Sequence, residues 1–185
     1  MADTDFSTVS PEVRCGYVNV FTPRQNPMSG SEDFSLQIIL DKQKDAAFIK
    51  QLQEAVDKIL NKIYPKGVPA GAWNPVRDAA EDADAKGKPL PEYLEGCVTV
   101  NVKNKQRPGV VDKDRMEVID PTLFQSGDYA RVHFNLFGYS KGSGGVSASL
   151  QNVMVTRKGE ALGNRVRAEE AFKNIETDSV DDWAA

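Results

Sequence analysis

The chain has few of the residues on which most catalytic and metal sites depend. It holds one histidine and two cysteines among 185 residues. A single histidine does not make a histidine-based metal site, and Cys15 and Cys97 are not at ligand spacing. The phosphate-binding patterns G-x-x-x-x-G-K-[ST] and G-x-G-x-x-G are missing as well. The sequence therefore predicts a protein that is not an enzyme and that has no metal and no cofactor.

Long hydrophobic runs are also missing. The longest clean aliphatic run, Ile38 to Leu40, is far shorter than the roughly 20 residues of a membrane span. The first residues lack the basic and then apolar pattern of a signal peptide. With two cysteines and no such signal, two reduced thiols are favoured over a disulfide. We therefore expect a cytoplasmic protein that does not bind membranes.

Charge of both signs is present, but it is unevenly distributed. The formal net charge is −4, and residues 169–185 hold six acids and one base. Residues 98–168 hold 11 lysines and arginines and six acids. Such an asymmetry is typical of proteins that contact nucleic acid and carry a charged tail, although basic strands are also found as merely solvated faces. Because residues 173–185 are acidic with few apolar residues, we expect them to form a disordered tail.

The hydrophobic pattern predicts several strands and one helix. Strands are expected at 14–21, 34–40, 98–107, 129–137 and 146–155. Apolar residues at helical spacing predict a helix from about Phe48 to Ile63, with Asp45 as its N-cap and Pro65 after its end. Residues 65–95 are rich in proline and glycine and are predicted to be a long connection that can include a helical turn. The expected fold is mainly β with one packed helix in a single domain, residues 1–172. It is either an OB-fold-like Greek-key barrel or a β-sandwich.

Three of the expected strands combine an apolar face with a polar, cationic or aromatic one. Alternation places Val98, Val100 and Val102 on one face of their strand. The opposite faces of the three strands carry Thr99, Asn101, Lys103, Lys105 and Arg107; Tyr129, Arg131, His133, Asn135 and Phe137; and Tyr17, Asn19 and Phe21. Cations that follow phosphates and rings that stack on unpaired bases are what single-stranded nucleic acid requires. Singly, each aromatic residue is equally compatible with a place in the core.

Two other classes of function stay open on the residues alone. A β-sandwich accessory protein could present the basic face to another protein. A metal-dependent nuclease could use the carboxylates of Asp78, Glu81, Asp82 and Asp84 or those of Asp112 and Asp114, although their spacing is typical of solvated loops. The glycine-rich "KGSGG" at 141–145 is interpreted as a hairpin turn rather than a phosphate cradle.

An ordered set of segments resembles a known family. The segments are "GYVNVFTPR" (16–24), "WNPVRD" (73–78), "RPGVVD" (107–112), "SGDYARVHFNLFGYS" (126–140) and "GVSASLQNVMVTRKGEALGNR" (145–165). Together they are similar to the phage-encoded single-stranded-DNA-binding proteins, over about residues 16–172. The resemblance implies an OB-fold that coats single strands during phage DNA replication, repair or recombination in the bacterial host cytoplasm, without catalysis.

The resemblance and the strand alternation together define the candidate DNA-binding residues. These are Tyr17, Asn19, Phe21, Trp73, Arg77, Lys103, Lys105, Arg107, Arg131, His133, Asn135, Phe137, Tyr139 and Lys141. The acidic end with its aromatic residue is similar to the tails through which such proteins recruit replication or recombination partners. Its candidate residues are Asp178, Asp181, Asp182 and Trp183. The oligomeric state stays open.

Overall fold

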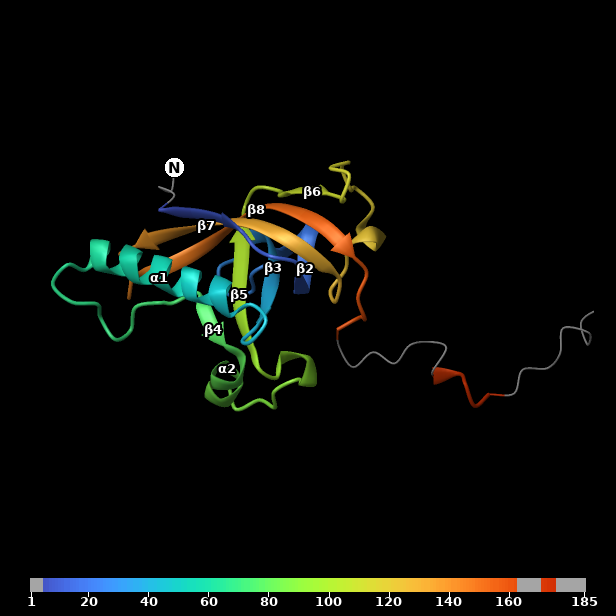
Figure 1. Ribbon diagram of the computed structural model, residues 1–185, viewed down its shortest axis with the longest axis horizontal. Helices are drawn as coiled ribbons and strands as arrows, with labels where there is room; N and C mark the ends of the chain where they lie inside the picture. The colour runs from blue at the N-terminus through green and yellow to red at the C-terminus, as the bar shows by residue number, and fades with distance from the viewer. Residues whose placement is uncertain (1–4, 163–170, 176–185) are drawn as a thin grey trace, which may run out of the picture.

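A ring of five hydrogen-bonded strands forms the centre of the computed structural model, which describes residues 5–162 and 171–175 (Figure 1). The strands are β2 (Val13–Gln25), β3 (Glu32–Asp41), β5 (Cys97–Asn104), β7 (Tyr129–Tyr139) and β8 (Gly145–Arg157). Pairing runs from β2 to β3, β5, β8 and β7 and returns to β2. β5 and β8 are parallel and meet only at Lys103 and Ser149, whereas the other pairs of the ring are antiparallel. The fold is thus an OB-fold-like barrel that is partly open between β5 and β8, not a sandwich.

Three short strands extend this ring at its margins. β1 (Phe6–Val9) lies antiparallel to β7, β4 (Val76–Asp78) antiparallel to β5, and β6 (Gly109–Val111) parallel to β8. The hydrophobic pattern did not predict any of them. Segments of three or four residues are too short for a period-two pattern to stand out, so tertiary pairing decides their structure.

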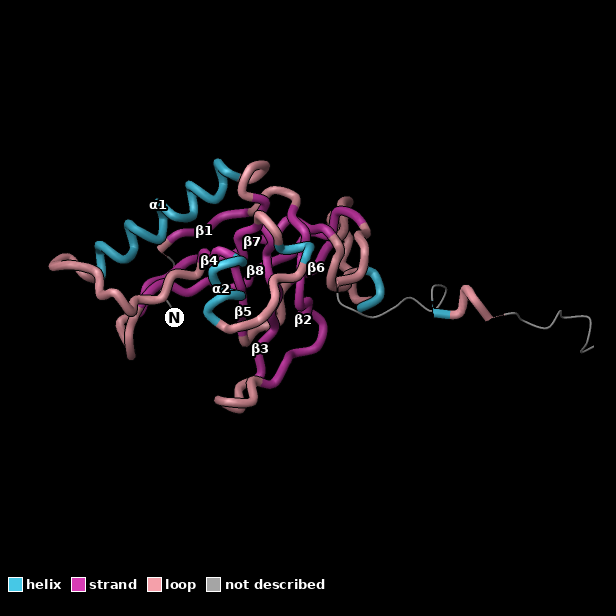
Figure 2. The backbone as a smooth tube through the Cα atoms, turned by 90° about the horizontal axis from the view of Figure 1, so that it is seen from below, coloured by secondary structure: helices cyan, strands magenta, loops and turns pink. Residues whose placement is uncertain are grey.

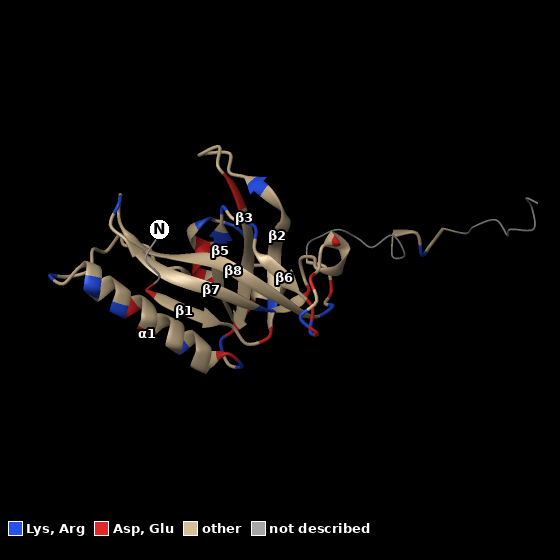
Figure 3. Ribbon diagram, turned by 90° about the horizontal axis from the view of Figure 1, so that it is seen from above, with Lys and Arg blue, Asp and Glu red and all other residues tan. Residues whose placement is uncertain are grey.

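The barrel core consists of the apolar faces that alternation predicted. Val100 and Val102 of β5 are fully buried, and so are Phe134 and Leu136 of β7. The helix α1 (Ala46–Ile63) lies along β7 and buries the face that contains Leu52 and Val56 (Figures 1 and 2). Its opposite face carries both basic and acidic residues and is solvated (Figure 3). The predicted helix is therefore confirmed, and it closes one side of the barrel.

Asp45 has the predicted N-cap position but not the predicted cap bond. Its carboxylate accepts a hydrogen bond from the backbone N–H of Asp41, at 2.9 Å, and no side-chain cap bond reaches α1. The buried carboxylate thus fastens the turn between β3 and α1 instead of the helix end.

The segment at 65–95, predicted to be a long connection with a helical turn, contains three regular elements. β4 is followed directly by the helix α2 (Ala79–Ala85) and, further on, by the 3-10 turn η1 (Glu92–Leu94) (Figure 2). Asp78 caps α2, because its carboxylate accepts hydrogen bonds from the N–H groups of Ala80 and Glu81. A helical element is thus present, but the hydrophobic pattern did not locate it, because "DAAEDADAK" has almost no apolar face and α2 buries only Ala79.

The cysteines match the expectation from the sequence. Cys15 lies in the barrel core and Cys97 at the start of β5, and both are free and buried. Burial raises the pKa of the Cys15 thiol to about 12, so this thiol stays protonated at neutral pH. No helix within the described ranges is long and apolar enough to cross a membrane.

Candidate nucleic-acid interface

A groove of about 1000 Å³ runs along the outer face of β3 and β5. Its barrel side carries Ser35 and Gln37 from β3 and Asn101 and Lys103 from β5. Ser35 pairs with Lys103 and Gln37 with Asn101, so these polar side chains form rows across the two strands. Side chains of Tyr17, Phe137 and Tyr139 also line the groove. The barrel thus presents a polar floor with aromatic rings at its margins.

The segment from Trp73 to Leu94, here called the insert, forms the opposite wall. It contributes Trp73, Pro75, Ala79, Asp82, Ala83, Lys86, Lys88, Pro89, Leu90, Pro91 and Leu94 to the groove. Backbone pairing ties it to the barrel at two places: β4 pairs with β5, and Trp73 pairs with Gly145 at the β7–β8 turn. The groove therefore lies between two walls of different origin.

Glycine at position 145 is needed for the contact between these walls. The N–H of Trp73 donates to Gly144, and the N–H of Val146 donates to the carbonyl of Trp73. A Cβ on Gly145 would lie 2.4 Å from the backbone nitrogen of Trp73, and φ of Gly145 is +143°. The glycine-rich segment 141–145 is thus a hairpin turn, as predicted, and it also positions the main chain of Trp73.

Arg77 packs against Trp73 and is held there by an ion pair. Its guanidinium carbon lies 4.9 Å from the centroid of the Trp73 ring. The Nε and Nη2 atoms of Arg77 donate to one carboxylate oxygen of Asp82, at 2.9 and 2.6 Å. The Asp82 hydrogen bond raises the pKa of Arg77, whose side chain is about one-third exposed. Arg77 is therefore bound to its own chain rather than free for a phosphate.

Tyr17 enters the groove because β2 is interrupted by a bulge. Gly16 pairs with Gln37 and Asn19 with Ser35, so β2 has one residue more than β3 between these two pairs, which is a β-bulge. Tyr17 lies in this bulge with φ of +45°, a conformation that costs free energy for any residue with a side chain. Its side chain is 60% exposed and interacts with the hydroxyl of Tyr93 in the insert. Burial and this interaction raise the pKa of Tyr93.

Asn19 and Phe21 lie outside the groove, and a second irregularity in the pairing of β2 with β3 falls between Asn19 and Arg24. They line a second, shallower hollow of about 370 Å³, together with Phe124 and Ser126. Phe21 is half-buried against the core, and the side-chain amide of Asn19 donates to the carbonyl of Tyr17. Strand alternation placed both residues on the face of Tyr17, and Val20 between them is buried as that alternation requires. They lie outside the groove because the pairing of β2 with β3 shifts on both sides of Asn19.

Only part of the predicted cationic stripe reaches the groove. β5 ends at Asn104, so Lys105 and Arg107 lie in the turn beyond it, exposed and outside the groove lining. The cations that line the groove are Arg24, Lys86, Lys88 and Lys103. Sequence reasoning missed the first three of these. Arg24 is the last residue of the segment "GYVNVFTPR", which resembles the family. Lys86 and Lys88 follow four acidic residues, so the net charge of their segment did not indicate contact with DNA.

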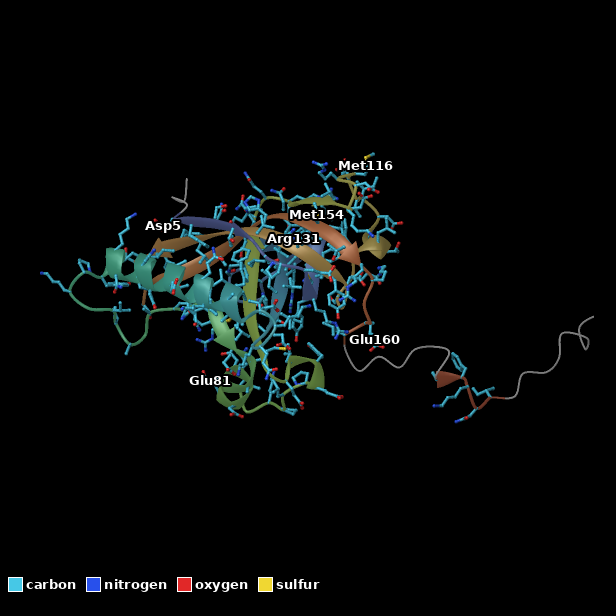
Figure 4. The ribbon with its side chains drawn as sticks, viewed as in Figure 1. Asp5, Glu81, Met116, Arg131, Met154 and Glu160 are labelled. Carbon is cyan, nitrogen blue, oxygen red and sulfur yellow. The ribbon has the colours of Figure 1, made fainter. Side chains whose placement is uncertain are left out.

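The predicted DNA-binding residues of β7 form two groups, and only those in the second half of the strand line the groove. Phe137 and Tyr139 line the groove, whereas Arg131, His133 and Asn135 do not. Arg131 donates to the carbonyl of Ser10 and lies beside Met154, far from Glu81 of α2 (Figure 4). The two ring nitrogens of His133 are within hydrogen-bond distance of Ser7 and Asn152.

Two further sets of predicted residues lie apart from the groove. Lys141 is exposed in the β7–β8 turn and is not part of the groove lining. The tail residues Asp178, Asp181, Asp182 and Trp183 lie outside the described residues.

The carboxylates considered for a nuclease do not gather into a metal site. Asp78 pairs with Lys42 at 2.5 Å, Asp82 with Arg77, and the Asp112 carboxylate accepts hydrogen bonds from its own turn. Within residues 5–162 and 171–175 no group of three or more histidine, cysteine or acidic residues is arranged to hold a metal ion. The acids serve instead as caps and ion-pair partners.

An OB-fold-like barrel with a groove of cations and aromatic rings on its β3–β5 face defines a class, the OB-fold proteins that bind single-stranded nucleic acid. Within that class the family is clear from the sequence. The model of the family described as "Enterobacter phage Enc34, ssDNA-binding protein" matches residues 7–184, and the chain belongs to this family. The family is one of DNA-binding proteins without catalysis, as the sequence predicted.

Individual relatives agree with this family. "Putative protein p50" of Acyrthosiphon pisum secondary endosymbiont phage 1 is 27% identical over 176 residues, which cover 88% of this chain and 90% of that protein. The single-stranded DNA-binding protein of bacteriophage Enc34, solved in complex with ssDNA, superposes with a TM-score of 0.70 at 19% identity, over 85% of this chain and 89% of that one. The gp2.5 protein of bacteriophage T7 has a TM-score of 0.59 at 14% identity, over 94% and 97%. These structures share the fold of this chain.

Proposed function

We propose that this protein binds single-stranded DNA in the groove between the barrel and the insert, largely without regard to sequence. The observation that carries the proposal is the composition of the groove. Tyr17, Trp73, Phe137 and Tyr139 line it together with four cations. Rings of this kind stack on unpaired bases at about 1–3 kcal/mol each, and cations attract the phosphates. This combination of rings and cations suits a single strand of DNA, and family membership supports the same function.

The roles of the side chains follow from their positions. Arg24, Lys86, Lys88 and Lys103 contact phosphates, and the four aromatic residues offer faces to bases. Gln37 and Asn101 lie on the floor between them and supply hydrogen bonds that adapt to different base edges. Amides that serve as both donors and acceptors favour tolerance of sequence. The predicted residues outside the groove would contact DNA only where a longer strand leaves it. These residues are Asn19, Phe21, Lys105, Arg107, Arg131, His133, Asn135 and Lys141.

The direct test is a fluorescence-anisotropy titration of labelled oligo-dT against a duplex of the same length. We expect tight binding to the single strand, weak binding to the duplex and a steep fall in affinity with salt. The slope of log affinity against log salt counts displaced counterions at about 0.7 per phosphate contact. Equal and feeble binding to both substrates would refute the proposal.

We further propose that the protein acts in phage DNA replication, repair or recombination, and that its acidic end recruits partner proteins. Residues 169–185 hold six acids and one base, and Trp183 adds a large ring to them. An acidic segment with one aromatic anchor fits a basic, apolar pocket on another protein. Deletion of residues 178–185 should keep or tighten DNA binding while abolishing partner recruitment. The expectation of tighter binding assumes that the acidic tail can also lie in the protein's own cationic groove, where it would compete with DNA. A truncated chain that bound oligo-dT more weakly would contradict this competition.

A further inference from the structure

One acid lies inside a groove that is otherwise cationic. Among the described residues that line the groove, Asp82 is the single carboxylate beside Arg24, Lys86, Lys88 and Lys103. A negative charge at this place repels a phosphate backbone and by itself lowers affinity for DNA. Its contacts suggest a benefit that outweighs this repulsion.

Asp82 acts on Trp73 through Arg77. One oxygen of its carboxylate accepts two hydrogen bonds from the Arg77 guanidinium, at 2.9 and 2.6 Å. That guanidinium lies 4.9 Å from the centroid of the Trp73 ring. The Asp82 side chain is 23% exposed and that of Arg77 34%, so the pair is partly shielded from water. Asp82 therefore fixes the side chain that covers one face of Trp73.

The two faces of the Trp73 ring thus have different environments. A guanidinium over an aromatic face is attracted by the ring and holds it in one orientation. Trp73 as a whole is 46% exposed and is one of the residues that line the groove. With Arg77 over one face of its ring, the opposite face is the one left for a base. Without the ion pair, Arg77 would leave the ring for solvent or for a phosphate.

We propose that Asp82 is a positioning residue for DNA binding: by holding Arg77 against one face of Trp73, it presents the other face to a base and strengthens binding despite its charge. The inference rests on the proposed function of the groove. Simple electrostatics predicts the opposite sign, because loss of an acid from the groove should tighten binding. Whether removal of the Asp82 carboxylate weakens or tightens DNA binding therefore decides between the positioning role and simple electrostatic repulsion.

The test compares Asp82→Ala with Asp84→Ala in titrations of labelled oligo-dT. Asp84 is an exposed acid of the same short helix, so its variant removes the same charge by the same side-chain change. Asp82 lies in the first turn, where an acid favours the helix dipole, whereas Asp84 lies near the C-terminal end, and the double-variant cycle below accounts for this difference. We expect Asp82→Ala to bind about three- to tenfold more weakly than the wild type, which is within the range of a cation–π contact and at the lower end of the range of a stacked base. Asp84→Ala should bind as well as the wild type or slightly better. An Asp82→Ala variant that binds as tightly as Asp84→Ala overturns the inference.

A double-variant cycle separates positioning from a merely structural role. In a Trp73→Leu background the ring is gone, so Asp82→Ala should no longer weaken binding and should tighten it slightly through the lost charge. Asp82→Asn keeps an oxygen that accepts from Arg77, and it should recover part of the affinity that Asp82→Ala loses. Equal weakening with and without Trp73 would show that Asp82 only stabilises the insert, and would overturn the inference.

Failure of this inference is distinguishable from failure of the proposed function. The wild-type protein is titrated with oligo-dT and with duplex in the same series. If the wild type does not prefer the single strand, the proposed function itself is wrong. If it does prefer the single strand and Asp82→Ala binds at least as tightly, only the role of Asp82 is wrong.

Discussion

The two walls of the groove are built by different means. The barrel wall belongs to long strands that pair over many residues, and β3 and β5 are in register from Phe34 to Asp41. The insert wall consists of short elements, β4, α2 and η1, which bury few apolar side chains of their own. The insert is held by β4, by the main chain of Trp73 and by ion pairs such as that between Lys42 and Asp78.

Because the two walls are built differently, we expect them to contribute differently to the stability of the protein and to its recognition of DNA. The barrel wall shares its strands with the core, so its outer side chains have a rigid support. The insert carries Trp73, Lys86 and Lys88 on a support with few buried contacts, and such regions open more readily than a core. We therefore expect changes in the insert to alter DNA affinity more than global stability.

The largest expected effect follows from forcing the two walls apart. Gly145→Ala places a Cβ 2.4 Å from the Trp73 nitrogen at a φ of +143°, so the turn or the insert has to move. We expect a loss of stability on the order of 1–3 kcal/mol in urea denaturation, together with weaker binding of oligo-dT. Gly142→Ala is the matched control, since its Cβ would meet nothing within 4 Å although φ is +68°. Equal effects of the two variants would mean that the contact with Trp73 is unimportant.

A ring on each wall allows stacking to be compared directly. Trp73→Ala in the insert and Phe137→Ala in the barrel should each weaken oligo-dT binding by about 1–3 kcal/mol, the value of a stacked base. Only Phe137→Ala should also lower the denaturation midpoint clearly, because Phe137 belongs to a central strand. Anisotropy titrations and urea curves on both variants provide the comparison. A Trp73→Ala variant with wild-type affinity would remove the insert from the binding site.

The cations can be compared by salt dependence. Lys103→Gln on the barrel and Lys88→Gln on the insert should each reduce the log–log salt slope by about 0.7. Lys105→Gln should leave the slope unchanged, because Lys105 lies in the turn after β5 and does not line the groove. A slope that fell equally for Lys105→Gln would restore the longer cationic stripe that alternation predicted.

The smallest effect concerns the two thiols, which report on the two walls. Cys15 lies in the barrel core, whereas the Sγ atom of Cys97 donates to the carbonyl of Tyr93 in the insert and to that of Glu95 directly after it. In native buffer we expect a thiol reagent to label Cys97 faster than Cys15, because opening of the insert costs less than global unfolding. Mass spectrometry of Cys15→Ser and Cys97→Ser variants assigns each rate. Equal rates would indicate that the insert and the barrel open together.

The raised pKa of Cys15 also fixes the direction of a pH effect. Its folded value of about 12 lies above the ordinary value of 9.0, so the unfolded chain loses this proton first as pH rises. Stability from the protonated thiol is therefore fully present below about pH 9 and is lost progressively towards pH 12. The Cys15→Ser variant should show a smaller loss over this range in urea denaturation.

Much of the barrel could be predicted because its strands are long and alternate cleanly. Val98, Val100 and Val102 predicted β5, and Ala130, Val132, Phe134 and Leu136 predicted β7. The same alternation correctly placed Lys103 and Phe137 on the outer face of the barrel. It did not show that Asn19 and Phe21 lie outside the groove, because no local pattern indicates the two register shifts of β2.

The insert could not be predicted in the same way. Its helix α2 is an acidic segment that buries little, and its strand β4 exists because β5 offers a free edge. Lys86 and Lys88 belong to a segment that is acidic overall, so its local charge pointed away from DNA. The tertiary structure makes Lys86 and Lys88 candidates for phosphate contact, because it places them in the same groove as Lys103.

The sequence by itself determined the barrel strands, the long helix, the reduced state of the two thiols and the family. It did so because alternation, helical spacing and ordered motifs are properties of neighbouring residues. The tertiary structure alone decided the second wall of the groove, the bulge that turns Tyr17 into it, and the chain of contacts from Asp82 through Arg77 to Trp73. Those features depend on which distant segments meet, and strand pairing, close approach at Gly145 and ion pairs are settled only when the barrel closes.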